Sequence, residues 1–442
     1  MTGVTPPASA RQVFAIALDG LGLAAATYLL WRAMFGNDIV LSPLAFQVGV
    51  LTSLACLVAP GAARRTPWPV IAYVAVAVVS AAMHDTLWVR PSGMGKIDSI
   101  PPYPVIIAVL GFGLAYTFRS PGRIAVALFA LLGCVSVLGT QILYDRFLTN
   151  MLYERGGSIS MPLVEQWGGL HQTGLLFVIV LPIALSVALV GRGVAQRAAG
   201  GVMVLGLMAI GFINGSRTGV LVMALTALAM MLLVLVRRGT GWRTWAMAAA
   251  LVAEIGLAGI AGERVSRGDG PIALTLKILE GNSTRPVIEL VTGDRWPIWQ
   301  AAAAVTMDHP VFGAGIGRYS QIMREGGYAA AYLPGHPEVQ HAGAGQAHNM
   351  VLHAAVEMGV PGAVCVIAIW FWMTGTAWRS WRAGRLPVIS LGLAGATGAF
   401  FMRSLADSFL DGLFTADRTA VIVALLLGLT MALGRRHRQA QQ

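Results

Sequence analysis

Long apolar runs separated by short polar breaks dominate the pattern of this chain. Most of these runs approach the ~20 residues that a helix needs to cross a bilayer. In lipid, a backbone N–H or C=O group without a hydrogen-bond partner is very costly, so each of these runs must be helical. The pattern therefore predicts an all-α polytopic membrane protein with about 12 transmembrane helices. The predicted spans are 12–34, 40–60, 67–86, 103–118, 122–142, 168–190, 198–214, 217–236, 243–261, 347–374, 387–404 and 413–434.

One polar stretch, between spans nine and ten, is long enough to fold as a unit of its own. It divides the chain into residues 1–261 with spans one to nine, a loop domain at 262–346, and residues 347–442 with spans ten to twelve and a short tail. We expect short interfacial helices within this loop domain.

The clearest of these helices is predicted from Trp296 to Met307. Asp294 has the side chain of a helix N-cap, and Pro297 suits a first turn. Trp296, Trp299 and a run of alanines give the helix an apolar face. This face predicts that the helix lies along the membrane interface.

The composition agrees with a membrane protein. The 442 residues are 56% hydrophobic and 12% charged, whereas a soluble domain has about 25% charged residues. A soluble globular protein is excluded, because so many uncharged runs could not all be buried in water. The three cysteines lie in apolar runs, so neither a disulfide framework nor a cysteine metal site is indicated.

The net charge of +11 is better explained by membrane topology than by a nucleic-acid partner, because the arginines lie in short loops. With the N-terminus in the cytoplasm, the inner segments are positive and contain no Asp or Glu, as the positive-inside rule expects. We therefore predict a membrane protein with an uncleaved first span, cytoplasmic termini and a loop domain on the outer side, which is the periplasmic face of the inner membrane if the cell is Gram-negative. No nucleic acid is expected to bind.

Two arginines on the outer side are candidates for binding an anion. Arg217 lies in the break between spans seven and eight, where topology requires no arginine. It either snorkels to the interface or clamps a phosphate with its planar donor fork. Arg295 precedes the loop helix. It is either an exposed loop charge or faces an anion together with the helix amides.

A histidine at the start of span ten is the candidate general base. The imidazole of a histidine such as His348 can accept a proton from a sugar hydroxyl, although histidines at helix ends are more often structural. His341 is the reserve candidate. The spacing of His341, His348 and His353 does not place metal ligands on one helix face, and the i,i+4 pair of His353 and Glu357 lies deeper in the span. We expect neither a metal nor a cofactor.

Other features favour different interpretations less strongly. Glu254 and Asp19 lie inside predicted spans, where ionisable groups are functional candidates by default, and this would suit a transporter. No row of such residues exists, however. The glycine-rich segment Gly313 to Arg318 has the wrong spacing for a dinucleotide fingerprint, and we interpret it as a flexible loop.

Taken together, these motifs resemble the O-antigen ligase and polymerase superfamily of bacterial envelopes. The resemblance covers roughly residues 200–375, and the first 190 residues match only in their pattern of spans. The matching residues, in order, are Ser216-Arg217-Thr218-Gly219, Arg295 with Trp299, Asp308-His309-Pro310 with the glycines at 313, 315 and 317, and His348-Asn349 with Leu352, Glu357, Gly359, Pro361 and Gly362.

The resemblance implies a GT-C-like scaffold and a metal-independent, inverting transfer at the periplasmic face. The implied donor is a glycan on undecaprenyl diphosphate in the membrane lipid. Arg217 and Arg295 would clamp the diphosphate, and His348 would be the general base. The remaining residues expected to bind substrate are His341, Asn349, Trp299 and Arg318.

The branches of this superfamily differ in the acceptor. The total length, the single large outer loop and the short tail favour an O-antigen ligase, which uses a lipid A–core oligosaccharide. An O-antigen polymerase and a protein O-oligosaccharyltransferase stay open as alternatives. A lipid-linked glycan flippase is the alternative from a different class, and it would need polar residues along a path through the membrane.

Overall fold

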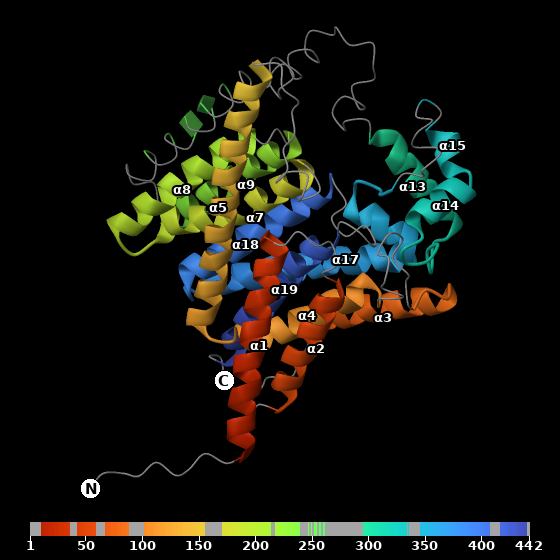
Figure 1. Ribbon diagram of the computed structural model, residues 1–442, viewed down its shortest axis with the longest axis horizontal. Coiled ribbons are helices and arrows are strands. Elements are labelled where there is room, and N and C mark those ends of the chain that lie inside the picture. Colours follow the sequence, from red (N-terminus) through yellow and green to blue (C-terminus); the bar gives the residue numbers. More distant parts are fainter. Residues whose placement is uncertain are drawn as a thin grey trace.

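The computed structural model describes residues 10–35, 42–58, 67–87, 101–154, 170–213, 217–238, 295–333, 345–406 and 416–439, with isolated positions at 246–260 and at 335. Within these ranges every regular element is a helix (Figure 1). The helices before the loop domain are α1 (Ala10–Phe35), α2 (Ser42–Val58), α3 (Trp68–Met83), α4 (Tyr103–Thr117), α5 (Pro121–Glu154), α7 (Leu170–Val190), α8 (Val194–Ile213) and α9 (Arg217–Arg238).

The later helices are α13 (Trp296–Asp308), α14 (Tyr319–Glu325), α15 (Tyr328–Tyr332), α17 (Met350–Arg382), α18 (Pro387–Ser404) and α19 (Ala416–Gln439). The predicted apolar runs coincide with helices, except run 243–261, where only isolated positions are described. The helices α5 and α17 continue beyond the predicted ends at 142 and 374, because polar residues at an interface do not by themselves end a helix.

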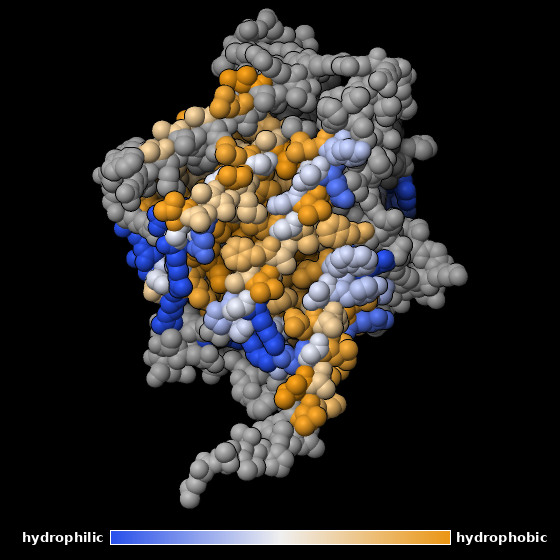
Figure 2. Space-filling view, turned by 60° about the vertical axis from the view of Figure 1, so that its left-hand side comes forward, coloured by the Kyte–Doolittle hydropathy of each residue, from blue (hydrophilic) through white to orange (hydrophobic). Residues whose placement is uncertain are grey.

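Five of the described helices are long and apolar enough to cross a membrane. This finding supports a multi-pass membrane protein, and the full set of twelve crossings stays a prediction. Figure 2 shows a broad apolar surface with hydrophilic side chains gathered at its margin, as expected of a lipid-facing protein. The five spans are Pro121–Tyr144, Thr173–Val190, Val194–Phe212, Thr218–Arg237 and Met350–Arg382.

Helix α7 lies at the centre of the bundle. Within its apolar span, Thr173–Val190, 89% of the residues are buried. It packs against α8, α9 and α18. Glycines of α18 allow this close approach, since a Cβ on Gly392 would lie 3.2 Å from the Cα of Ile183, and one on Gly395 would lie 2.6 Å from the Cβ of Pro182. Small residues serve membrane helices in this way because association in lipid depends on close packing.

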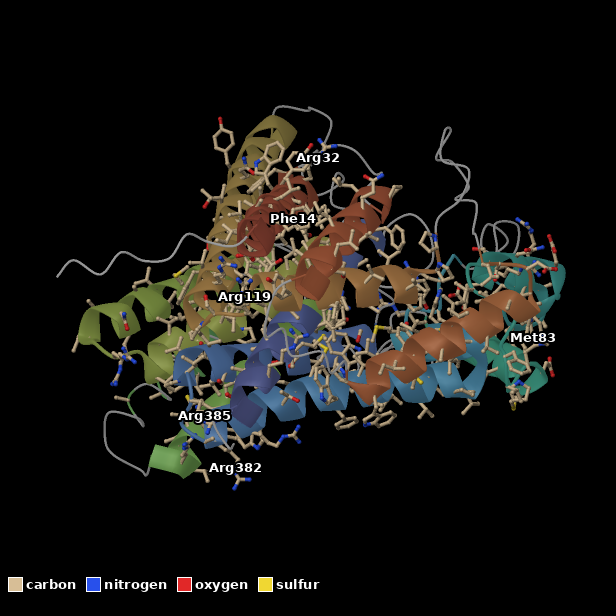
Figure 3. The ribbon with its side chains drawn as sticks, turned by 90° about the horizontal axis from the view of Figure 1, so that it is seen from below. Phe14, Arg32, Met83, Arg119, Arg382 and Arg385 are labelled. Atoms are coloured by element: carbon tan, nitrogen blue, oxygen red, sulfur yellow. The ribbon has the colours of Figure 1, made fainter. Side chains whose placement is uncertain are left out.

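One face of the bundle carries arginine contacts that fix the direction of two helices. Arg237, near the end of α9, donates to the carbonyl oxygens of Trp381 (2.5 Å) and Arg382 (2.9 Å), near the end of α17. Helices α9 and α17 therefore end on the same face, and both begin towards the opposite one. Figure 3 shows Arg382 and Arg385 at one end of the molecule and Met83 at the other, beside the helices α13 to α15.

The loop domain contributes a compact unit at that opposite end (Figure 1). Helices α13, α14 and α15 share a small core with the start of α17, built around Ala301, Ala302, Tyr319 and Val356. The alanine face of α13 is thus covered by protein. The small side chains of these alanines let α13 pack directly on α17, and the expectation that the helix lies along the membrane interface stays a prediction.

Candidate functional site

The candidate site centres on the turn that precedes α17. His348 is half-buried and has a positive φ of 50°, a conformation that few residues other than glycine adopt. Asn349 then caps the helix: its Oδ1 accepts from the amides of Val351 (3.0 Å) and Leu352 (3.1 Å). Its Nδ2 donates to the carbonyl oxygen of Leu405 at 3.0 Å, which ties this turn to the end of α18.

Helix α17 is interrupted at Gly359, whose φ is 72°. Such a break leaves carbonyl groups without their partners in the helix. Here the segment before α14 supplies amides: Ala314 donates to the carbonyl oxygen of Val356 (2.7 Å) and Gly315 to that of Glu357 (3.2 Å). In return, the amide of Val360 donates to Pro310 at 2.8 Å. The glycine-rich segment is therefore docked along the break in α17.

Glycine is required at both surfaces of this contact. A Cβ on Gly313 would lie 2.3 Å from the carbonyl carbon of Glu357, and one on Gly359 would lie 2.6 Å from the carbonyl oxygen of Pro310. Both residues also have positive φ, which costs other residues free energy. The interpretation of Gly313 to Arg318 as a flexible loop is wrong, because the glycines allow close approach rather than freedom.

Two buried ionisable residues lie beneath this contact. The Nε2 atom of His353 is 3.3 Å from Oε1 of Glu357, and both side chains are buried. The amide of Gly317 donates to the same Oε1 at 2.9 Å. From α3, the hydroxyl of Ser80 donates to the carbonyl oxygen of Glu357 at 2.9 Å. The i,i+4 spacing noted in the sequence thus produces a contact between its two members.

An aromatic ring completes the surroundings of the pair. The ring of Tyr319 stacks on His353 with a centroid distance of 4.8 Å. Burial, with a further contribution from the charge of Glu357, raises the pKa of Tyr319 above its usual range, so its phenol stays neutral. At the edge of the unit, a hydrogen bond to Asp308 raises the pKa of Tyr328 to about 12.

The structure brings together several of the residues predicted from the sequence. Arg295 immediately precedes α13, and its carbonyl accepts from the amide of Trp299 at 2.9 Å. Both side chains are half-buried. Because α13 shares a core with Ala347, these residues belong to the same unit as the His348 turn. The N-cap predicted at Asp294 lies outside the described residues, and the position before the helix is Arg295.

Arg318 lies on the docked segment and reaches α3. Its Nη2 donates to the carbonyl oxygen of His84 at 2.7 Å. Arg217 is the first residue of α9, which begins towards the same face as α17, but its side chain lies outside the described part of the chain. His341 also lies outside the described residues. The structure therefore places Arg295, Trp299, Arg318, His348 and Asn349 in one region.

The contributions of α3 to this region could not be predicted from the sequence. Ser80 and His84 lie more than 200 positions before their partners, inside a run that looked like an ordinary apolar span. Within the described residues, no group of three His, Cys, Asp or Glu side chains is arranged to hold a metal ion. The expectation of a metal-independent site stays a prediction.

A comparison with protein families finds one match in the region of this site. Residues 201–367 match the family model described as O-antigen ligase. The matched range contains α9, the unit of α13 to α15 and the His348 turn, and it ends within α17 after the break at Gly359. No curated protein matches the chain.

Proposed function

This chain is a member of the O-antigen ligase and polymerase superfamily, and from that premise we propose that it is an O-antigen ligase. The proposed reaction moves a glycan from undecaprenyl diphosphate to a lipid A–core oligosaccharide. The observation that carries the proposal is the packing of α13 to α15 on the start of α17. This packing brings the start of α13 beside Arg295, the Gly313–Arg318 segment and the His348 turn into one unit, which supports a shared role in one site.

The chemistry needs a base for the acceptor and positive charge for the leaving group. In the proposed mechanism, His348 takes the proton from an acceptor hydroxyl as its oxygen attacks the anomeric carbon of the donor. The bond from that carbon to the diphosphate oxygen breaks with inversion. Undecaprenyl diphosphate leaves with the electron pair, and no metal or other cofactor takes part.

Arg217 and Arg295 are proposed to stabilise the charge that develops on the leaving diphosphate. A preorganised donor of this kind is worth about 3 kcal/mol in other enzymes. His341 is the alternative base, and Asn349, Trp299 and Arg318 are proposed to bind substrate. The half-buried positions of Arg295 and Arg318 support this role, because partial burial strengthens charge interactions while leaving access for a ligand.

A groove on the membrane side supports a lipid-linked donor. It has a volume of about 430 Å³, is almost wholly apolar, and is lined by residues of α2, α3 and α4 that include Leu54, Ile71 and Phe112. Its wall residue Val74 is six positions before Ser80 on α3, about 9 Å along the helix at 1.5 Å per residue. A polyprenyl chain leaving the site sideways would find apolar surface there.

The transporter alternative loses part of its support. Asp19, one of the two acids considered above as support for a transporter, is bound by Arg119 at 2.7 and 3.0 Å and by Arg123 at 3.1 Å. Charge pairing within the protein therefore accounts for this acid without a transport path. Glu254, the other acid, lies outside the described residues.

The site is proposed to face the periplasm from the inner membrane, with both termini in the cytoplasm. This orientation follows from the arginines on the face where α9 and α17 end and from the positive-inside rule. The choice of a ligase among the three branches rests on the single large outer loop, 262–346.

A reconstituted reaction tests the proposal. The purified protein is given an undecaprenyl diphosphate-linked glycan and three acceptors in parallel: lipid A–core, a second lipid-linked repeat unit and a pilin-like peptide. We expect transfer to lipid A–core, unchanged by EDTA. Transfer to one of the other acceptors would instead assign the polymerase or the protein-glycosylating branch. Movement of the donor across vesicles without any transfer would support a flippase.

A further inference from the structure

The buried carboxylate of Glu357 lies where three segments of the chain meet. Its side chain is 1% exposed. Its Oε1 accepts from Gly317 and contacts His353, and its main-chain oxygen accepts from Ser80 and Gly315. Removing a carboxylate from water is costly unless hydrogen bonds or opposite charge compensate, and the contacts of Oε1 with Gly317 and His353 supply part of that compensation.

Each segment that meets at Glu357 either contains a residue of the proposed site or makes a hydrogen bond to such a residue. Glu357 belongs to the part of α17 that begins just after His348 and ends at the break at Gly359. Gly317, which donates to its carboxylate, immediately precedes Arg318. The guanidinium of Arg318 in turn donates a hydrogen bond to the carbonyl oxygen of His84 at the end of α3. Glu357 therefore joins the helix of the proposed base to the loop of a proposed substrate-binding arginine.

We propose that Glu357 is a positioning residue, whose carboxylate holds the Gly313–Arg318 segment against α17 so that Arg318 and His348 meet the same substrate. The inference rests on the proposed function and assigns Glu357 no contact with the reacting atoms. Misplacement of a group by about 1 Å can cost ~10²-fold in rate. A single bond from Glu357 to the loop amide can therefore control the reaction from a distance.

His353 supports this arrangement from the side. Its Nε2 lies 3.3 Å from the Oε1 atom that accepts from Gly317, and its ring is held by stacking on Tyr319. Tyr319 is the first residue of α14, directly after Arg318. The imidazole therefore contacts both the carboxylate of Glu357 and the first residue of α14, the helix that follows the docked segment.

Two substitutions separate the hydrogen bond from the charge. Glu357→Gln keeps a side-chain oxygen that can accept from Gly317, whereas Glu357→Ala removes it. With the full-length protein, undecaprenyl diphosphate-linked glycan and lipid A–core, we expect Glu357→Ala to lower kcat/KM by about 10²-fold, mainly by raising KM for the donor. Glu357→Gln should stay close to the wild type.

The division between KM and kcat distinguishes positioning from a purely structural role. Loss of folded protein would lower the apparent kcat and leave KM unchanged, and that result for Glu357→Ala would overturn the inference. Equal damage in Glu357→Gln and Glu357→Ala would also overturn it, because the charge and not the loop contact would then matter.

Limited proteolysis gives a readout that needs no activity. Release of the segment should expose the bond after Arg318 to trypsin in Glu357→Ala, while cleavage after Arg385, on the face where α17 ends, should match the wild type. Unchanged protection at Arg318 would count against the clamp. If the wild-type protein transfers glycan to no acceptor, the proposed function fails, and the trypsin pattern still tests the clamp independently.

A pair of glycines tests the same contact from the loop side. Gly313 and Gly327 have similar φ values, 69° and 75°. A Cβ on Gly313 would strike the backbone of Glu357, whereas one on Gly327 would meet nothing within 4 Å. We expect Gly313→Ala to raise KM and expose Arg318 as Glu357→Ala does, and Gly327→Ala to do neither. Equal effects of the two substitutions would mean that backbone strain, not docking, is responsible.

Discussion

At the scale of single residues, the arrangement of the His348 turn supports the proposed role of His348 as a base. Its neighbour Asn349 is fixed by three hydrogen bonds, two to the first turn of α17 and one to Leu405. A side chain at the end of such a fixed turn needs little reorganisation to meet an acceptor, which is the condition for efficient proton transfer.

Replacement of His348 should therefore remove catalysis and leave the fold intact. We expect His348→Ala to lower transfer by about 10²–10⁴-fold, the usual contribution of a general base. The matched control is His309→Ala, since His309 follows α13 in the same unit but has no proposed role. Transfer from lipid-linked glycan to lipid A–core is measured alongside thermal unfolding in detergent. Full activity in His348→Ala, with loss in His341→Ala, would make His341 the base.

The guanidinium of Arg295 should matter for the leaving group. Arg295→Ala is expected to lower kcat by about 10²–10³-fold, as loss of one preorganised donor does elsewhere. Arg324→Ala is the control, because Arg324 lies in α14 of the same unit and its side chain is half exposed. Similar losses in both variants would indicate a general effect of positive charge on the unit and would contradict a specific clamp.

At the scale of secondary-structure elements, the broken helix α17 was only partly predictable. The apolar run predicted a helix there, and it is present. The sequence also contains Gly359 and Pro361, the residue types found at kinks. It could not show that the amides of Ala314 and Gly315 satisfy the freed carbonyls, because such pairing depends on segments 42 positions apart coming together.

The break should be sensitive to any side chain at Gly359. Gly359 and Gly384 both have a φ of 72°, but only at Gly359 would a Cβ strike backbone, that of Pro310 and Val311. Gly384→Ala should cost about 1–2 kcal/mol from the left-handed conformation alone, and Gly359→Ala should cost clearly more. Thermal unfolding in detergent compares the two. Equal losses of unfolding free energy in the two variants would show that the segment before α14 can move away from α17 without a cost in stability.

At the scale of the whole molecule, the sequence predicted the positions of helices well and their relations poorly. Span limits follow from local hydropathy, which each run carries by itself. The buried contacts of Glu357 with Ser80 and Gly317 depend on three segments far apart in the chain. The alanines of α13 illustrate the same limit, because an apolar face suits a membrane surface and a protein core equally, and only the packing decides between them.

The separation of the ion cluster at Asp19 from the proposed site gives a final prediction. Asp19 binds Arg119 and Arg123 close to the start of α5, and none of the bonds described above links this cluster to the start of α17. Asp19→Asn should therefore leave the KM and kcat of glycan transfer unchanged. Because the side chain of Arg119 is 43% exposed, solvent screening should limit the loss of unfolding free energy to about 1 kcal/mol or less.

Steady-state kinetics and thermal unfolding on the same purified samples test this expectation, with Glu357→Ala as the variant that should change KM. The comparison also separates the two classes of function. A transporter that uses the acid inside its first span would lose flux in Asp19→Asn without losing stability. An enzyme whose chemistry lies at the opposite face would lose a little stability and no activity, because charge pairs at one face of a packed bundle act on the other only through the fold.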